Sequence, residues 1–191
     1  MQEDGPFVVG VSGASGAAIA VRVLEGLRSA HAPVALVASR AGLEVLHGEV
    51  GLDRAALAGY ADAVYADDDI GAPIASGSRP SRGMAIVPCS SSTAAKVALG
   101  LADNLLTRAA QVHLKERRKL IVVPRETPMP TILLRHLADL SALGVVVLVP
   151  APAYYLKPRT IEDVTDYLAG KVLDHLGVAH RLYRGWKVEG S

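Results

Sequence analysis

The sequence predicts an α/β fold in which helices cover both faces of a doubly wound parallel sheet, giving three layers. Five short runs are apolar throughout and lack the alternation of a strand with one face in water. Longer segments between these runs repeat apolar residues with the period of an α-helix. Strands that alternate with helices along a chain are typical of a parallel sheet.

The expected strands are buried on both faces and end in turns that contain glycine, proline or hydroxyl residues. In chain order they are residues 7–12, 34–39, 84–88, 120–124 and 145–150. The expected helices are residues 17–29, 41–49, 93–101, 104–119, 131–143 and 160–176. Thr160 and Asp163 form a capping-box pattern at the start of the last helix, and Gly177 stands at its expected C-cap.

Length and composition indicate a single domain, residues 1–191. A chain of 191 residues, 50% of them apolar, is long enough to bury a substantial core. The 20 Lys and Arg residues nearly balance the 19 Asp and Glu residues, so the chain has no strong field for nucleic acid or an anionic membrane. Aromatic residues make up only 4%, too few for a surface that stacks bases.

Cysteine and histidine usage excludes further kinds of site. Cys89 is the only cysteine, which excludes an internal disulfide and a thiolate metal cluster, and we expect it to be a small buried hydrophobe. The six histidines lack paired metal-ligand spacing, so no metal is expected. The N-terminus is acidic and no uninterrupted apolar stretch could span a bilayer, so we expect a cytoplasmic protein.

Two segments fall outside the alternation of strands and helices. Residues 65–83 form a long irregular connection with Ser76, Gly77 and Ser78, which is either a functional loop or a flexible one. Residues 178–191 form a C-terminal tail that carries the only tryptophan, Trp186. The tail is either exposed or packs near the functional site or on a neighbouring subunit.

Polar residues gather where the expected strands end. The carboxyl ends of parallel strands share one edge of the sheet, and ligands of open α/β sheets bind at that edge. Small hydroxyl residues, glycines, a charged pair and tyrosines follow the strands, at residues 12–16, 39–40, 89–93, 124–128 and 150–155. No comparable set is expected at the opposite edge, so the carboxyl edge is the candidate binding site.

Two of these turns precede helices and are candidate anion sites, Gly13-Ala14-Ser15-Gly16 and Ser90-Ser91-Ser92-Thr93. Free backbone N–H groups and the helix dipole favour a phosphate at such a turn. The spacing of the first, G-x-x-G-x-x-G, matches neither a dinucleotide fingerprint nor a Walker loop. An ordinary Ser-rich helix cap without a ligand is the alternative for each turn.

Charged side chains provide two more candidates. Asn104, Arg108 and Lys115 project from one side of an expected helix, either as a phosphate-binding stripe or as a solvated face. Arg125 and Glu126 follow a strand between two prolines and either hold an anionic group or form a structural ion pair.

Three motifs resemble those of the UbiX-type flavin prenyltransferases, flavoproteins of the homo-oligomeric flavin-containing decarboxylase superfamily. They are the turn at 13–16, the block DNLLTRAAQVHLKERRKL at 103–120, and the run VPRETP at 123–128. The resemblance extends from about residue 7 to residue 177, which is nearly the whole chain.

The resemblance implies a flavodoxin-like or Rossmann-like fold, trimers that assemble into a dodecamer, and FMN bound between subunits. The implied reaction transfers a dimethylallyl group from dimethylallyl monophosphate to N5 and C6 of reduced FMN, releases phosphate and needs no metal. The implied product is the prenylated FMN cofactor of UbiD-type decarboxylases.

Individual roles follow from positions in the shared motifs. The resemblance implies that Ser15, Glu49 and Glu126 surround the reacting edge of the flavin. It implies FMN contacts at Gly13, Ala14, Ser15, Ser39, Ser90, Ser91, Ser92, Thr93 and Arg108. It implies prenyl-donor contacts at Ser76, Gly77, Lys115, Arg125, Tyr155, Lys171 and Trp186, with the loop at 76–78 reaching across a subunit boundary.

Three positions depart from the family pattern. Ser92 replaces a glycine, which predicts a strained backbone or a shifted flavin phosphate. Ile70 stands where some members have a tryptophan, so one aromatic wall of the prenyl pocket is missing. Lys171 stands where members often have arginine, which keeps the charge but loses the bidentate fork.

Two other functions stay open. An FMN-binding carrier, or an inactive subunit associated with a decarboxylase, would fit the departures at Ser92 and Ile70. A decarboxylase of peptidyl-cysteine or phosphopantothenoyl-cysteine would need a histidine after the first helix and an Asn-Met segment. His47 is the only nearby histidine, and the chain has no Asn-Met pair.

Overall fold

A six-stranded sheet forms the centre of the computed structural model, which describes residues 5–185. All strands are parallel, in the order β3-β2-β1-β4-β5-β6. Their bounds are β1 Phe7–Val11, β2 Val34–Ala38, β3 Ala63–Tyr65, β4 Gly83–Cys89, β5 Leu120–Pro124 and β6 Val146–Val147. The strand order reverses between β1 and β4, which is where a Rossmann-like sheet binds its ligand.

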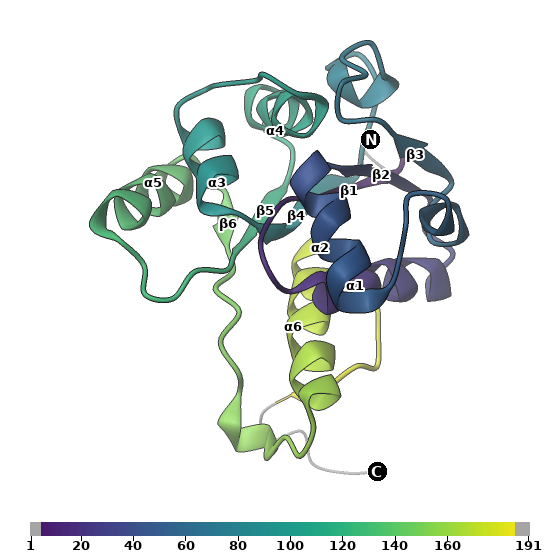
Figure 1. Ribbon diagram of the computed structural model, residues 1–191, viewed down its shortest axis with the longest axis vertical. Coiled ribbons are helices and arrows are strands. Elements are labelled where there is room, and N and C mark those ends of the chain that lie inside the picture. Colours follow the sequence, from purple (N-terminus) through teal and green to yellow (C-terminus); the bar gives the residue numbers. More distant parts are fainter. Residues whose placement is uncertain (1–4, 186–191) are drawn as a thin grey trace.

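Six α-helices cover the two faces of the sheet (Figure 1). Their bounds are α1 Ala17–Ser29, α2 Arg40–Val50, α3 Ser91–Ala98, α4 Leu105–Lys115, α5 Thr131–Ala142 and α6 Ile161–Leu176. Helices α1, α2 and α6 pack with one hydrophobic cluster, and α3, α4 and α5 pack with the other. The three-layer, doubly wound fold predicted from the sequence is therefore confirmed.

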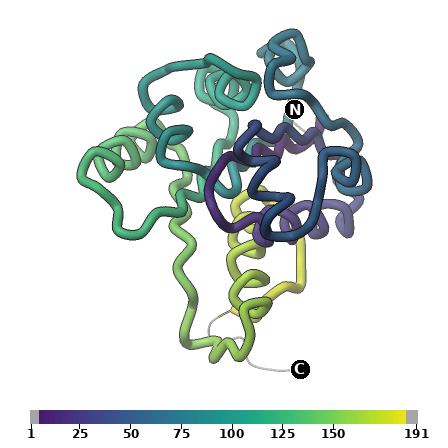
Figure 2. Tube along the Cα trace, viewed as in Figure 1, coloured from purple at the N-terminus to yellow at the C-terminus, as the bar shows by residue number. Residues whose placement is uncertain are grey.

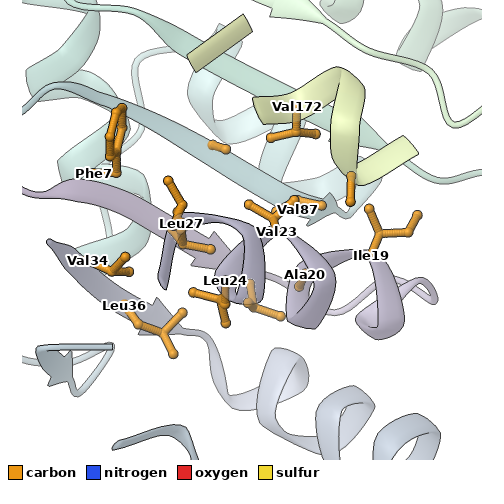
Figure 3. Close-up of a cluster of buried hydrophobic side chains, with 14 of the residues drawn as sticks. Phe7, Ile19, Ala20, Val23, Leu24, Leu27, Val34, Leu36, Val87 and Val172 are labelled. Atoms are coloured by element: carbon orange, nitrogen blue, oxygen red, sulfur yellow. The ribbon is translucent and has the colours of Figure 1, made fainter. Parts of the chain in front are cut away.

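Alternate residues of each central strand belong to opposite clusters. In β1, Phe7 and Val9 pack toward α1 and α6, whereas Val8 packs on the other face. Figure 3 shows Leu24 and Leu27 of α1 among the side chains of the first cluster. Burial on both faces explains why these strands read as continuous apolar runs in the sequence.

The predicted elements differ from the observed ones mainly at one end of the sheet. The expectation of a strand over 145–150 is wrong beyond Val147, because the chain then leaves the sheet through Pro150 and Pro152, which have no N–H to donate. The short strand β3 was not predicted, since its three residues are only half-buried. The helix expected over 104–119 ends at Lys115.

Residues 66–82 pack against the body of the protein, which argues against a flexible loop. They contain a short 3-10 helix, Pro73–Ala75, in which Ile74 and Ala75 are buried. These residues belong to the same hydrophobic cluster as α4. The connection between β3 and β4 is therefore a folded part of the domain.

An arm, residues 148–160, extends away from the sheet between β6 and α6 (Figure 2). A 3-10 helix, Tyr154–Leu156, lies in this arm, and the side chain of Tyr154 is 80% exposed. Helix α6 returns from the arm to pack against α1 and β4. No helix in residues 5–185 combines the length and the apolar character that a membrane crossing requires.

Candidate functional site

The two glycine- and serine-rich turns meet at the carboxyl edge of the sheet, where the strand order reverses. The buried Ser12 hydroxyl donates to the carbonyl oxygen of Pro88 at 3.0 Å. The hydroxyl oxygen of Ser12 in turn accepts from the backbone N–H of Ser90 at 2.7 Å. Ser12 therefore joins the ends of β1 and β4 and holds the turns at 13–16 and 90–93 beside each other.

The first turn already holds an anion that the chain itself supplies. One oxygen of Glu49 accepts from the N–H of Gly16 at 2.9 Å and from the N–H of Ala17 at 2.8 Å. Burial opposes the charge of Glu49, but hydrogen bonds from Ser15, Gly16 and Ala17 and the nearby Arg125 keep its pKa below the ordinary value. The Glu49 carboxylate thus occupies the N–H groups of Gly16 and Ala17, at which a phosphate was one of the two alternatives.

The second turn differs because its first helical N–H groups have no partner within residues 5–185. Ser90 caps α3, and its hydroxyl oxygen accepts from the N–H of Thr93 at 3.3 Å. Ser91 and Ser92 follow as the first two helical residues, and neither backbone N–H is hydrogen-bonded. Open N–H groups, three serines and a threonine at a helix N-terminus suit a phosphate.

Ser92 does not strain the backbone. It lies in the first turn of α3 and is exposed. Among the described non-glycine residues, positive φ angles occur only at His31, Arg117 and Lys157. The strain expected from a serine in place of glycine is therefore absent, since Ser92 has an ordinary helical conformation.

Arg125 and Glu126 bind different partners beside these turns. Arg125 is exposed, and its Nε donates to the carbonyl oxygen of Ser15 at 3.3 Å. The carboxylate of Glu126 accepts from the hydroxyl of Ser91 at 2.8 Å. Within the described chain neither residue belongs to an ion pair, so the structural ion pair considered above is not formed.

Ser39 and Gly13 bring α2 close to the same edge. The Ser39 oxygen caps α2 by accepting from the N–H of Gly42 at 3.0 Å. A Cβ on Gly13 would lie 2.5 Å from the Cβ of Ala41, so glycine is required for this approach. The carboxyl edge thus presents an exposed glycine, small hydroxyl groups and the Arg125 side chain on a rigid frame.

The side chains of Asn104, Arg108 and Lys115 all lie against residues 67–77, and those of Arg108 and Lys115 are also exposed to solvent. The amide of Asn104 donates to Asp67 at 3.0 Å, and Nε of Arg108 donates to the carbonyl oxygen of Ala75 at 3.2 Å. Lys115 pairs with Glu116. A Cβ on Gly77 would lie 2.6 Å from Nζ of Lys115, so the loop passes directly over the end of α4.

The loop at 76–78 lies at the amino edge of the sheet, since it precedes β4 and contacts the end of α4. Arg118 holds this loop by donating to the carbonyl oxygens of Gly77 at 2.6 Å and Arg79 at 2.8 Å. The expectation that the opposite edge carries no comparable polar set is therefore wrong, since Ser76, Gly77 and Lys115 lie there. In one protomer these three residues lie at the amino edge of the sheet, whereas Arg125 lies at the carboxyl edge.

Two further candidates lie apart from both edges. Tyr155 is in the 3-10 helix of the arm and is 44% exposed. Lys171 is in α6, where its Nζ lies 3.4 Å from Asp174 and 6.0 Å from the centre of the Tyr183 ring. Trp186 lies outside the described residues.

The remaining candidates have structural environments that limit their chemistry. Burial raises the pKa of Cys89 to about 12, so its thiol stays protonated. Burial lowers the pKa of His113 to about 4, and its ring bonds to Ser81 and to the Ala109 carbonyl oxygen. Ile70 is 48% exposed. Residues 5–185 contain no group of three or more His, Cys, Asp or Glu side chains placed to hold a metal ion.

Sequence reasoning missed Ser12, Asp174 and Tyr183. Ser12 stands directly after a predicted strand, and a hydroxyl residue at a strand end was the available sequence signal. Asp174 lies three residues after Lys171 on a helix, a spacing that brings two side chains together. Tyr183 has no such signal, because its contact depends on how the chain folds back after α6.

Comparisons with known proteins agree with this geometry. A model of the family described as Flavoprotein matches residues 1–173. A flavin prenyltransferase UbiX from Thermoplasma acidophilum is 45% identical, covering 94% of this chain and 99% of the relative. One from Streptomyces coelicolor is 44% identical, covering 95% of each chain.

Solved structures show the same relationship. A dodecameric FMN-dependent UbiX-like decarboxylase from Escherichia coli O157:H7 superposes with a TM-score of 0.93 at 38% identity, covering 95% of this chain and 99% of that one. AnUbiX (PadA1), solved with FMN and dimethylallyl pyrophosphate, gives a TM-score of 0.89 at 37% identity, covering 96% and 99%. The chain belongs to the flavoprotein family and, within it, to the UbiX flavin prenyltransferases.

Proposed function

We propose that this enzyme binds FMN at the carboxyl edge of the sheet and transfers a dimethylallyl group from dimethylallyl monophosphate to N5 and C6 of reduced FMN. Phosphate is released, and the product serves UbiD-type decarboxylases. The observation that carries the proposal is the contrast between two helix termini. The chain fills the start of α1 with Glu49 and leaves the N–H groups at the start of α3 open.

The residues at the carboxyl edge fit FMN. Ser90, Ser91, Ser92 and Thr93 would hold its phosphate at the start of α3, where N–H and hydroxyl donors converge. Gly13, Ala14, Ser15 and Ser39 would line the flavin, with Arg108 as a further contact. Reduced FMN supplies the nucleophilic ring atoms. Ser12, which ties the two turns together, would keep the phosphate and ring subsites in register.

The residues proposed for the prenyl donor come from three separate places in one protomer. Arg125 lies at the carboxyl edge, Lys115 with the loop at 76–78 lies at the amino edge, and Tyr155 and Lys171 lie on the arm and α6. We propose that neighbouring protomers bring these groups together in trimers that form a dodecamer. The dodecameric Escherichia coli relative supports this assembly.

The charges of these groups suit the departure of phosphate. Breaking the allylic C–O bond places negative charge on the leaving phosphate, and fixed cations stabilise that charge by several kcal/mol. The prenyl cation left behind needs surroundings without a nucleophile, and the Cys89 thiol at the end of β4 is protonated and fully buried. Glu49 holds the turn that carries Ser15, so both residues fix the edge where the flavin reacts.

The proton lost from the flavin ring carbon goes either to Glu126 or to the released phosphate. The hydroxyl of Ser91 donates to Glu126 and orients its carboxylate toward the start of α3. Glu126→Gln separates the two acceptors. Loss of the final product would assign the proton to Glu126, and full activity would assign it to phosphate.

The reaction itself is tested by anaerobic incubation of the protein with reduced FMN and dimethylallyl monophosphate, followed by mass spectrometry of the flavin. The expected result is a flavin heavier by one C5H8 unit. Dimethylallyl pyrophosphate in a parallel incubation identifies the donor. An unchanged flavin mass with both donors, while FMN still binds, would replace the proposal with an FMN carrier.

A further inference from the structure

The segment that follows α6 folds back onto this helix at a glycine. After Gly177, the backbone N–H of Val178 bonds to the carbonyl oxygen of Leu173, and residues 178–185 pass beside α6 (Figure 1). A Cβ on Gly170 would lie 2.6 Å from the Tyr183 ring and 2.8 Å from the His180 ring. Only a residue without a side chain allows both rings to lie against the helix backbone.

The polar ends of the two rings converge on one carboxylate, Asp174. The hydroxyl of Tyr183 donates to Oδ2 of Asp174. Nδ1 of His180 accepts from the N–H of Leu182 at 3.2 Å, so its Nε2 carries the proton and donates to Oδ1 of Asp174 at 3.0 Å. The rings of Tyr167 and Tyr183 also pack edge to face, with 5.0 Å between their centres.

This carboxylate and the Tyr183 ring together hold the ammonium group of Lys171. Nζ lies 3.4 Å from Oδ2 of Asp174 and 6.0 Å from the centre of the Tyr183 ring. Burial alone would lower the pKa of Lys171, but Tyr183 and Asp174 keep it above the ordinary value, so the group is charged at neutral pH. The side chain is 34% exposed and can therefore meet an anion.

The same C-terminal segment also borders the arm that carries Tyr155. Leu182, Tyr183 and Arg184 line a cavity of about 330 Å³ together with residues 153 and 156–159 of the arm. Asp166 on α6 binds Arg22 on α1, which fixes this part of α6 to the body. The segment thus connects the two elements that carry the donor-binding candidates Tyr155 and Lys171.

We propose that Asp174, His180 and Tyr183 are positioning residues that hold Lys171 in one orientation for the phosphate of the prenyl donor. A lysine has several rotatable bonds and lacks the planar fork by which arginine fixes its own geometry. Residues 178–185 supply contacts that fix the orientation of the Lys171 side chain. The inference rests on the proposed function, because it takes Lys171 as a ligand of the prenyl phosphate.

Gly170→Ala tests the inference, and Gly48→Ala is the matched control. A Cβ on Gly48 meets nothing within 4 Å, and alanine favours a helix at both positions. In Gly170→Ala we expect trypsin to cut after Arg181 and Arg184 faster. We expect the KM for dimethylallyl monophosphate to rise about tenfold, with kcat and FMN affinity within about twofold. Gly48→Ala should match the wild type in all four measurements.

Tyr183→Phe keeps the ring packing and removes only the hydroxyl bond to Asp174. We expect the donor KM to rise severalfold, and Lys171→Arg in the same chain to restore it, because arginine brings its own fork. Faster tryptic cleavage of Gly170→Ala with an unchanged KM would overturn the positioning role, as would unchanged values of both. Lys171→Ala separates a failure of the positioning role from a failure of the proposed function. An unchanged donor KM in this variant would refute the placement of Lys171 in the proposed donor site.

Discussion

The carboxyl edge of the sheet and the arm region, residues 148–185, carry their candidate site residues in different ways. At the carboxyl edge, contacts between residues far apart in the sequence fix each group within one protomer. Glu49 reaches the start of α1, and Ser12 joins β1 to β4. In the arm region the described partners of Lys171 are close in the sequence, Asp174 and Tyr183, on a helix that packs against α1.

This difference assigns different tasks to the two regions. The carboxyl edge is a preorganised binding surface, because the core of the sheet holds its hydrogen-bond donors in fixed positions. The arm, residues 148–160, extends away from the sheet (Figure 2), and in the proposed assembly the candidates of the arm region would reach a flavin on a neighbouring protomer. We therefore expect substitutions at the edge to affect flavin binding and chemistry, and substitutions in the arm region to affect only the prenyl donor.

The largest effect is expected for Arg125→Ala. In residues 5–185, Arg125 is the one cation that both bonds to Ser15 and lowers the pKa of Glu49, and this variant removes it. We expect kcat/KM for prenylation to fall about a hundredfold, or roughly 3 kcal/mol. Arg40→Ala is the control, since the Arg40 side chain is 96% exposed and, among residues 5–185, pairs only with Glu44. Equal losses in both variants would show a general effect of surface charge.

Tyr155→Phe tests whether a residue of the arm affects the prenyl donor and not FMN. The lost phosphate hydrogen bond should raise the KM for dimethylallyl monophosphate about tenfold. FMN affinity should not change, because Tyr155 lies outside the proposed FMN site. Tyr154→Phe, at the 80% exposed neighbouring position, should behave as the wild type. Weakened FMN binding in Tyr155→Phe would contradict the division of tasks.

Glu49→Ala tests whether Glu49 stabilises the start of α1, through the free energy of unfolding. The variant should lose about 1 kcal/mol of unfolding free energy at pH 7, because two N–H groups at the start of α1 lose their partner. The pKa of Glu49 is lowered in the fold, so its contribution is present above the ordinary value of 4.5 and is lost as pH falls through the folded pKa. Chemical denaturation between pH 7 and 3 should show the difference from wild type disappearing. A constant difference over this range would refute the capping role.

Ser92→Gly should have the smallest effect. Ser92 already has a helical backbone, and its only described side-chain contact is a 3.4 Å approach to Ser90 Oγ. We expect the FMN dissociation constant, measured by fluorescence quenching, to change less than about threefold. Much tighter binding in the variant would show that the serine displaces the flavin phosphate.

The central strands and the turns after them could be predicted because both signals are local. Residues 120–124 read as one buried run and form β5, and residues 17–29 form α1. The Glu49 contact with Gly16 could not be predicted, since it joins residues 33 positions apart and no pattern marks a carboxylate as a cap for another helix. The short strand β3 and the packing of Tyr183 likewise depend on tertiary contacts.

The division of one reaction site between protomers is tested most directly by co-expressing two variants that are each impaired in prenylation. Arg125→Ala lacks the edge residue, and Lys171→Ala lacks the α6 residue. In mixed oligomers some sites combine an intact edge with an intact α6 from a neighbour. The account predicts that prenylation returns to about a quarter of the wild-type rate, as random mixing of protomers requires. Activity no higher than that of either variant alone would show that each site lies within one protomer.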